Sequence, residues 1–512
     1  MTAHHIATLL TPTWGQTTSY IHVATQMLNK DPNVVITIVQ HNLMVPQMET
    51  ELASEGRTYD KARLRIIGVG PKDVAVGYTK GLEQLFAGWM ENISQFAQES
   101  SEGWPTPHTV HLDWNVGGSV VEPTKQVLVS LPAYLSEPDF AVIADDIYAD
   151  EAKRAGRSLQ EILQQVVMAS NGTDKLSGAV VKFPGGLEMY DHECHPYAAG
   201  PALLMGAAVA DAQRLAKTVD GFIATTSSCI EPTGVPYCRE LYEKRGQELF
   251  TIGMQAHPCC WENDVRVTPS DERVRSFLDS AVRQYGKRSV LYISFGSIYF
   301  PVATRQHVEA LVTTLLDLEK PFPFIFALGS KVASLPQRLV DRVNASGKGL
   351  VCNFWVEQRA ILQHGAVGWF LTHGGWNSLS ESLTQGIPLI VWSASGEQAL
   401  NAAFFSTGPN PVAIELFQIR AGAQIGPSLH SDAKITGTLE DASAEFGATF
   451  AAARGARGEI LQENAAKMAN ILKMAHAGRG SGGNCPVGQI LRGTCARAFV
   501  CAPKGGMCPA KF

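Results

Sequence analysis

The stretch WFLTHGGWNSLSESLTQGIPLI, residues Trp369–Ile390, decides the fold, because a group of His, Gly, Trp, Asn and Ser separates two apolar runs. A buried strand is expected over Val367–Leu371 and a short helix over Ser378–Gln385. The end of this helix is indicated by Gly386 and Pro388, which are typical of helix termination. The polar group therefore occupies a strand-to-helix turn.

A strand-to-helix turn of this composition predicts an anion site. Gly374 and Gly375 have no side chain, so their backbone can approach a ligand closely. The helix N-terminus adds N–H groups and a positive partial charge, and His373 and Ser378 add side-chain donors. A phosphate group fits these properties.

Two side chains near the turn have structural alternatives. Ser378 and Glu381 stand at the spacing of a capping box, so Glu381 can serve the helix cap alone. Trp376 can equally be a core aromatic residue. The turn by itself leaves both alternatives open.

The length and the apolar pattern of the chain predict two α/β domains. The chain has 512 residues, and a single core stops growing at roughly 250 to 300 residues. Apolar strands alternate with helical stretches in both halves, which is the βαβ rhythm of parallel sheets. The strands predicted in the first half are residues 6–10, 34–42, 64–70, 140–146 and 221–227, and those in the second half are 289–296, 322–329, 349–354, 367–371 and 388–392.

The domain boundaries follow from breaks in this pattern. Residues 251–271 contain two prolines and adjacent cysteines but no periodicity, as expected of an interdomain linker. We therefore expect one domain over 1–252 and another over 284–476, joined by a linker over 253–283. The tail over 477–512 is rich in Gly, Cys and Pro. Its cysteines lack metal-ligand spacing, so we expect a poorly ordered or lineage-specific tail and not a metal or disulfide module.

Composition excludes several classes of partner. The net charge of −6 gives no basic footprint for nucleic acid or for an anionic membrane surface. No run reaches the roughly 18 apolar residues of a membrane span, and no basic region precedes the first apolar run, so a signal peptide is not indicated. We expect a cytoplasmic monomer whose cysteines are mostly reduced thiols.

The segment from Trp355 to Gln398 reads WVEQRAILQHGAVGWFLTHGGWNSLSESLTQGIPLIVWSASGEQ. This strongly resembles the donor-binding signature of family-1 UDP-glycosyltransferases, the group that contains plant secondary-metabolite glucosyltransferases, and it matches without a gap. The stretch VLYISFGSIYF resembles the Gly-Ser loop of the same family, and FPGGLEMYDHECHP and FIATTSSCIEP resemble weaker landmarks. The resemblance covers Ile6 to about His476. It implies the α/β GT-B fold, with two facing Rossmann-like domains, parallel sheets and an interdomain cleft.

The resemblance also implies a role for each matching residue. Trp355 is expected to stack on uracil with its flat apolar face, and Gln358 and Glu381 to hold the ribose hydroxyls. The positions that line the diphosphate are Gly296, Ser297, His373, Gly375, Asn377 and Ser378. The positions near the sugar are Trp376, Glu397 and Gln398, and the closing Gln favours glucose.

The resemblance further implies UDP-sugar as co-substrate, with no other cofactor and no metal. No DxD motif occurs near a predicted strand end, and in this family helix dipoles and donors stabilise the leaving diphosphate. The cluster Asp191–His195 has no accompanying pair of ligands, so structural packing is favoured over zinc binding.

The chain departs from the family at the general base. The family has a His after the first strand in a context like P-x-x-G-H, whereas this chain reads PTWGQTT, with Gln16 at the His position. An amide cannot accept a proton usefully near neutral pH, so Gln16 does not supply the rate enhancement of a general base, which is typically about 10²- to 10⁴-fold. Asp145, in VIADD, stands where the orienting acid is expected. Asp145 or Asp146 becomes a candidate base if burial raises its pKa.

Nearby histidines do not replace this group easily. His4 and His5 lie at the other end of the first predicted strand, about 17 Å from its carboxyl end at roughly 3.3 Å per residue. His22 lies about 9 Å further along the helix from Gln16. A His from another loop remains an alternative.

Three functions follow for testing. The first is an inverting transferase that moves glucose from UDP-glucose to a hydroxyl of a small apolar acceptor, which is phenolic, terpenoid or lipid. The second is a UDP-sugar-binding pseudoenzyme, because the donor residues are present but the base is not. The third is a dinucleotide-dependent oxidoreductase, against which the absence of GxGxxG after the first strand counts.

Overall fold

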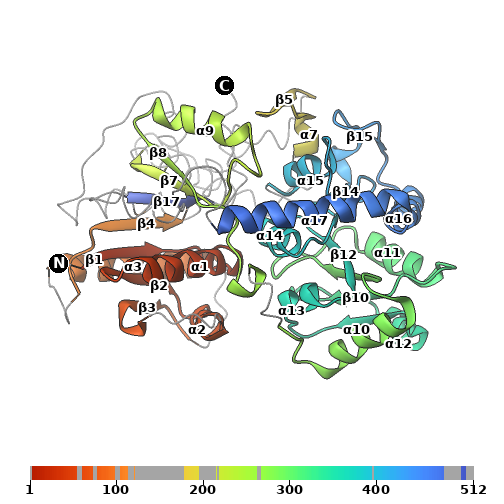
Figure 1. Cartoon of the computed structure of the whole chain (residues 1–512), viewed down its shortest axis with the longest axis horizontal. Helices are drawn as coiled ribbons and strands as arrows, with labels where there is room; N and C mark the ends of the chain where they lie inside the picture. Colours follow the sequence, from red (N-terminus) through yellow and green to blue (C-terminus); the bar gives the residue numbers. More distant parts are fainter. Residues whose placement is uncertain are drawn as a thin grey trace, which may run out of the picture. The chain divides into compact units, whose positions relative to one another are not determined.

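The computed structural model describes residues 3–54, 60–72, 78–98, 104–113, 120, 178–194, 215, 218–261, 267–394, 397–477 and 498–502. These residues divide into two compact units (Figure 1). Unit 1 is drawn from Met1–Lys175, Ala199–Pro258 and Ala475–Lys504, and unit 2 from Leu176–Ala198, Cys259–Met474 and Gly505–Phe512. The predicted boundaries at residues 252 and 283 stay predictions.

Unit 1 is built on a parallel sheet of seven strands in the order β3-β2-β1-β4-β17-β7-β8. The strands are β1 (His4–Leu9), β2 (Val34–His41), β3 (Leu64–Val69), β4 (Thr109–Asp113), β7 (Gly221–Ala224), β8 (Glu248–Thr251) and β17 (Ala498–Ala502). The helices are α1 (Trp14–Lys30), α2 (Val45–Ser54), α3 (Tyr78–Gln98) and α9 (Gly234–Glu243), with a 3₁₀ turn at Lys61–Arg63.

Alternation along the strands of unit 1 produces two cores. Ile6 of β1 packs in a cluster with Ile21 of α1, whereas Ala7 packs with Leu85 and Trp89 of α3. Successive residues of a strand point to opposite faces, so β1 supplies both clusters. Both faces of the sheet are therefore covered, as expected for a parallel sheet.

Unit 2 is built on a parallel sheet of six strands in the order β11-β10-β9-β12-β13-β14. The strands are β9 (Val290–Ser294), β10 (Phe324–Ala327), β11 (Gly349–Cys352), β12 (Val367–Thr372), β13 (Leu389–Val391) and β14 (Ala413–Glu415). The helices are α10 (Glu272–Tyr285), α11 (Arg305–Asp317), α12 (Gln337–Ser346), α13 (Gln358–Gln363), α14 (Trp376–Thr384), α15 (Gln398–Ser406), α16 (Leu439–Ala453) and α17 (Ala456–His476).

Smaller elements complete unit 2. The antiparallel hairpin β5 (Val180–Lys182) and β6 (Glu188–Tyr190) continues into α7 (Asp191–Cys194), and a second pair joins β15 (Gly426–Pro427) to β16 (Lys434–Ile435). 3₁₀ turns occur at Pro258–Cys260 and Gly422–Gln424. Residues 178–194 come from the first half of the sequence, yet they pack within unit 2.

The strand order of unit 2 is that of a Rossmann fold. Numbered along the chain, its strands follow the order 3-2-1-4-5-6, which reverses between β9 and β12. Ligands of such sheets bind outside the carboxyl ends of the strands at this reversal. The prediction of α/β domains with parallel sheets is confirmed. The loops after β9 and β12 are where this sheet order predicts a ligand site.

The structure tests the individual elements predicted from sequence. All five strands predicted for the second half are present, as are four of those predicted for the first half. The fifth, residues 140–146, lies outside the described residues, as does most of the tail. Part of the tail, Ala498–Ala502, forms β17. Among the described residues, none of the helices is long and apolar enough to cross a membrane.

Candidate functional site

The two loops at the strand reversal of unit 2 begin side by side. β9 and β12 are hydrogen-bonded neighbours, and the last residues of the two strands, Ser294 and Thr372, are register partners. The loop after β9 carries Gly296 and Ser297, and the turn after β12 carries His373. Sequence reasoning predicted these two loops together, and the sheet brings them to one edge.

The His373 imidazole is closely packed between two glycines. A Cβ atom built on Gly296 would lie 2.9 Å from His373 Cε1, and one built on Gly375 would lie 2.5 Å from His373 Nε2. Gly296 also has a φ of 82°, in the left-handed region that favours glycine. Any side chain at either position would displace the imidazole, so the glycines are required by His373 as well as by a ligand.

The charge of His373 follows from its environment. Burial lowers the pKa of this histidine to about 4, so the imidazole is neutral near pH 7. Nδ1 lies 3.3 Å from the Thr372 hydroxyl, and the imidazole can donate through its other nitrogen in the appropriate tautomer. A neutral donor is therefore available at the start of α14.

The turn into α14 is held by a contact that sequence reasoning missed. Gly374 has a φ of 84°, and its carbonyl oxygen accepts a hydrogen bond of 2.9 Å from the Asn401 amide of α15. Asn401 is 27 positions away in the chain, and no local pattern predicted its role. The glycine turn is thus fixed from the neighbouring helix.

The helix itself starts earlier than expected. α14 begins at Trp376 with Gly375 as its N-cap, and within the described residues no side chain makes the cap hydrogen bond. The capping box predicted for Ser378 and Glu381 is therefore wrong, because Ser378 lies inside the first turn. A helix end without a side-chain cap suits an anion, since its N–H groups carry positive partial charge.

Glu397 reaches the same helix end. Burial raises the pKa of its carboxyl to about 7, although a hydrogen bond from the backbone N–H of Trp376 opposes the shift. Gln398, the first residue of α15, accepts a hydrogen bond of 3.0 Å from the N–H of Ala394. The two residues predicted to face the sugar therefore lie next to the turn predicted to hold the diphosphate.

Trp376 has the burial and the contact of a core aromatic residue. Its side chain is only 5% exposed, and its ring lies 6.5 Å from that of Phe405 on α15. Core packing is thus part of its role, and a contact with the sugar stays a prediction. Asn377 and Ser297 are half-buried and Ser378 is buried.

The residues predicted to bind the nucleoside lie in the loop after β11 and on α13 and α14. Trp355, in the loop after this strand, is 59% exposed, which is unusual for so large an apolar side chain. The Gln358 amide of α13 donates to the Glu381 carboxylate of α14 at 2.8 Å. The pair predicted to hold the ribose is therefore in contact, and an exposed indole suits stacking on a base.

Unit 1 has its own strand reversal, between β1 and β4. Gln16 lies in the first turn of α1, and its side-chain oxygen accepts a hydrogen bond from the Thr13 hydroxyl. The predicted acid Asp145 and its neighbour Asp146 lie outside the described residues. The edge nevertheless holds an acid, Asp113, the last residue of β4.

Asp113 is a functional candidate that sequence reasoning missed. Its side chain is 1% exposed, and it accepts a hydrogen bond of 2.5 Å from the hydroxyl of Thr11, which follows β1. The available signal was the run TVHLD, a short apolar strand that ends in Asp as VIADD does. The pairing of β1 with β4 places this Asp beside the loop that follows β1 and leads into α1.

His4, His5 and His22 contact other residues than those around Gln16. His4 contacts Thr109, the first residue of β4, and is thus at the opposite end of that strand from Asp113. His5 contacts Thr37 and the Pro105 carbonyl. His22 pairs with Glu51 of α2 at 3.5 Å. Each of the three therefore has a structural partner away from the edge that carries Gln16.

The cluster at Asp191–His195 is described up to Cys194. His192 contacts the Pro427 carbonyl at 3.1 Å, and Glu193 pairs with His430 at 3.2 Å. In the part of the chain that the structure describes, no three His, Cys, Asp or Glu residues are grouped to hold a metal ion. The contacts of His192 and Glu193 are those of structural packing.

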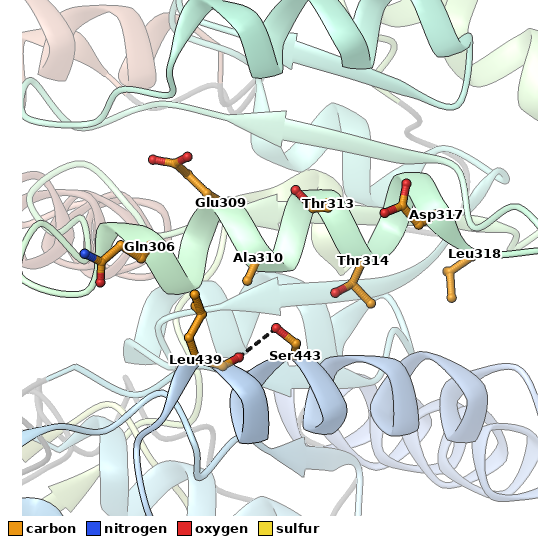
Figure 2. Close-up of a pocket in the computed structure, with 9 residues that line it drawn as sticks. All are labelled: Gln306, Glu309, Ala310, Thr313, Thr314, Asp317, Leu318, Leu439 and Ser443. Atoms are coloured by element: carbon orange, nitrogen blue, oxygen red, sulfur yellow. Dashed lines mark hydrogen bonds between the residues drawn. The ribbon is translucent and has the colours of Figure 1, made fainter.

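A surface depression of about 620 Å³ lies elsewhere in unit 2, between α11 and α16 (Figure 2). The residues that line it include Glu309, Thr313 and Asp317 of α11, with Leu439 and Ser443 of α16. Ser443 donates to the Leu439 carbonyl within the same helix. None of the predicted donor residues lines this depression, so it is a separate feature.

Comparison with known proteins finds similarity over the part of the chain that carries these residues. Residues 261–421 match the family model described as "UDP-glucoronosyl and UDP-glucosyl transferase". The chain is 29% identical to UDP-glycosyltransferase eriJ of Hericium erinaceus over 68% of each chain. It is 33% identical to UDP-glycosyltransferase 92A1 of Arabidopsis thaliana over 36% of this chain and 37% of that one.

A solved structure supports the fold over nearly the whole length. The structure of Phytolacca americana UGT2, complexed with UDP-2fluoro-glucose and pterostilbene, matches with a TM-score of 0.64 and 16% identity. The match covers 97% of this chain and 99% of that one. At this identity the match shows the fold alone, and that fold is GT-B. Together these findings indicate a family-1, plant-type UDP-glycosyltransferase, with the family model matching residues 261–421.

Proposed function

We propose that the chain is an inverting enzyme that transfers glucose from UDP-glucose to a hydroxyl of a small apolar acceptor, which is phenolic, terpenoid or lipid. The observation that carries this proposal is the neutral His373 imidazole, held between Gly296 and Gly375 where α14 begins. The Phytolacca protein is described with a fluorinated UDP-glucose and the phenol pterostilbene. Those ligands support a glucose donor and an apolar phenolic acceptor here.

The donor half of the reaction requires charge stabilisation. The bond between the anomeric carbon and the diphosphate oxygen breaks, and UDP leaves with the electron pair. The N–H of a neutral His373 and the positive end of α14 are suited to stabilise this charge, which supports catalysis without a metal. Glu397 and Gln398 are the proposed partners of the sugar hydroxyls.

The acceptor half requires a base, because the attacking hydroxyl must lose its proton. Gln16 cannot supply one, since an amide does not accept a proton near neutral pH. Asp145 stays a candidate from sequence. Asp113 is a second candidate for the same task, supported by its place beside β1 and by its contact with Thr11.

A combined donor and acceptor screen tests the proposal. Purified protein is incubated with UDP-glucose, UDP-galactose or UDP-glucuronate, together with phenols, terpenoid alcohols and fatty alcohols. Release of UDP and the mass of any conjugate are then measured. We expect UDP-glucose and an apolar hydroxylated acceptor to give a hexose adduct. Binding of the donor without turnover on any acceptor would contradict the proposal.

One observation favours a second candidate, a UDP-sugar-binding protein without turnover. Gln16, at the position where the family resemblance implies the base, accepts a hydrogen bond from Thr13, while the turn proposed to hold the donor is fixed by Asn401. Calorimetry that detects UDP binding in the absence of any UDP release would favour this alternative. A nicotinamide-dependent oxidoreductase is no longer proposed, because the family comparison points to UDP-sugars.

Other expectations stay proposals. A role in secondary metabolism, a cytoplasmic location and a monomeric state rest on the sequence and on the resemblance. The absence of any cofactor besides the UDP-sugar has the same basis. Size-exclusion chromatography with light scattering tests the oligomeric state directly, and activity in the presence of EDTA tests metal independence.

A further inference from the structure

Residues 178–194 pack within unit 2, although they are not part of the sequence motif at Trp355–Gln398. This segment contains the hairpin β5–β6 and helix α7, and it belongs to unit 2 although Ala199–Pro258, which belong to unit 1, separate it from most of that unit in sequence. Figure 1 shows α7 beside α15, the helix that begins at Gln398. The segment is held to unit 2 by ionic contacts and by apolar contacts.

The ionic contacts form a buried cluster of four side chains. Glu193 pairs with His430 at 3.2 Å, His430 pairs with Glu415 at 2.8 Å, and Glu415 pairs with Arg420 at 2.6 Å. All four side chains are at most 3% exposed. We call Glu193, His430, Glu415 and Arg420 the charge quartet.

The charge quartet is electrically balanced. Burial acts to raise the pKa of Glu193, but hydrogen bonds from His430, Ser428 and the Leu429 N–H lower it to about 2. Burial acts to lower the pKa of His430, but the bonds to Glu193 and Glu415 raise it to about 9. Near pH 7 two negative and two positive groups therefore face each other, and such burial is tolerable only while every charge is paired.

Backbone bonds extend the same anchor. The second carboxylate oxygen of Glu193 accepts hydrogen bonds of 2.9 Å from the N–H groups of Tyr190 and Leu429. His192, next to it, contacts the Pro427 carbonyl. The anchor therefore ties α7 to the loop around β15, which follows α15 and β14 in the chain.

The apolar contacts lead directly to α15. Met189 of β6 is buried in a cluster with Ala399 and Ala403, and Leu187 and Cys194 pack against the same cluster. Ala399 and Ala403 are four residues apart, so they share one face of α15. This face of the helix is covered by the segment.

A different face of α15 contacts the donor turn. Glu397 accepts a hydrogen bond from the N–H of Trp376, and Asn401 donates to the Gly374 carbonyl. The ring of Phe405 lies against that of Trp376. Positions 397, 401 and 405 are spaced by four and form one row. α15 therefore connects the segment to the sugar side of the donor turn.

We propose that residues 178–194, fixed by the charge quartet, are a positioning element for the sugar end of the donor. Glu193 and His430 are positioning residues that act through α15 on Glu397 and Asn401, and they do not touch substrate. This inference rests on the proposed function, because it assumes that the sugar lies beside Glu397. Uridine and ribose contacts come from Trp355, Gln358 and Glu381, which are on other elements.

The inference separates binding of UDP-glucose from binding of UDP. His430→Gln leaves the buried Glu193 without its ionic partner, and Glu193→Gln leaves the charge quartet with one excess positive charge. The segment and α15 are expected to shift in both variants. We expect the affinity for UDP-glucose to fall roughly tenfold, with the affinity for UDP unchanged within about twofold. The double variant Glu193→Gln with His430→Gln removes one charge of each sign, so most of the lost affinity is expected to return.

Calorimetry with UDP and with UDP-glucose, on the full chain and each variant, is the test. Glu188→Gln is the matched control, because Glu188 is in the same hairpin and its pairing with Lys182 is exposed. Met189→Ala probes the apolar contact independently and is expected to reduce UDP-glucose affinity selectively. It keeps the test decisive if a charge variant fails to fold.

Each outcome decides the question. Equal loss of UDP and UDP-glucose affinity, or a lowered melting temperature with the ratio of the two affinities unchanged, overturns the positioning role and leaves a purely structural one. Failure of the double variant to recover affinity also contradicts it. If the unaltered chain binds UDP but not UDP-glucose, the proposed function fails first and this inference falls with it.

Discussion

The carboxyl end of β12 in unit 2 and the carboxyl end of β4 in unit 1 have equivalent places in their sheets. Each of the two strands is the neighbour of the first strand of its sheet, β9 or β1. The donor edge of unit 2 carries two glycines packed on a neutral histidine at an uncapped helix start. The edge of unit 1 carries a buried pair, Asp113 and Thr11, beside an amide. Under the proposed function, nucleotide binding and proton transfer therefore depend on different residues of this chain.

The largest effect is expected from removing the donor edge. Trp355→Ala together with His373→Ala removes the proposed base-stacking surface and a donor to the diphosphate. The stacking alone is worth roughly 1 to 3 kcal/mol per base, so UDP affinity should fall by roughly 10³-fold with the histidine included. Calorimetric titration with UDP measures this.

A matched control is Trp261→Ala, which removes another tryptophan of unit 2 from outside the donor motif. Unchanged UDP affinity in the double variant would remove the basis for assigning nucleotide binding to this edge. A loss in the control of equal size would point to a general effect on folding.

The next effect is expected at the edge of unit 1. Asp113→Asn keeps the shape of the side chain but removes its charge, and we expect kcat to fall by roughly 10²-fold, within the range of general-base contributions. UDP affinity should not change, because Asp113 belongs to the other unit. Steady-state kinetics and UDP titration on the same preparation separate the two quantities.

Asp60→Asn is a suitable control, since Asp60 caps an exposed 3₁₀ turn of the same unit. A kcat unaffected by Asp113→Asn would return the task to Asp145. A parallel loss of UDP affinity would contradict the separation of the two edges.

A smaller gain is expected from restoring the base. Gln16→His places an imidazole in the first turn of α1, and we expect activity on weakly acidic alcohols to rise roughly tenfold or more. Acidic phenols should gain less, because they need less help in losing a proton. Comparing rates for a phenol and for an aliphatic alcohol measures this difference.

The prediction for Gln16 has a clear contrary outcome. Equal or lower rates on both acceptors would show that position 16 is not the base position in this chain. Gln16→Asn supplies the control, because it alters the side chain without adding a titratable group.

Local signals made the donor edge predictable, whereas contacts between distant residues did not. Gly374, Gly375 and the flanking apolar runs are adjacent in sequence, and the strand and helix followed from them. The helix start was misplaced because it depends on the turn fixed by Asn401, which lies on another element. Asp113 was missed because β4 is short and its pairing with β1 joins residues about a hundred positions apart.

The charge quartet is a second case in which contacts between distant residues could not be predicted from sequence. Asp191, His192 and Glu193 suggested a polar cluster from sequence, but the partner His430 lies in another part of the chain. Composition and spacing carry no information on that pairing. Sequence therefore predicts which residues can do chemistry at a turn, and packing determines which helices hold them in place.

The smallest effect is expected in how the affinity for UDP-glucose depends on pH. Burial raises the pKa of Glu397 to about 7 from its ordinary value near 4.5, so this carboxyl loses its proton as pH rises through about 7. The carboxylate accepts stronger hydrogen bonds from sugar hydroxyls than the protonated form does. UDP-glucose affinity should therefore rise a few-fold between about pH 6 and 8, and Glu397→Gln should abolish the rise. Titrations of the unaltered chain and of Glu397→Gln with UDP-glucose at each pH measure this. UDP is not the reference ligand, because its terminal phosphate titrates at about pH 6 and UDP-glucose has no such group. A UDP-glucose affinity that is equally flat with pH in both chains would place the sugar away from Glu397, and so away from the face of α15 that contacts the turn before α14.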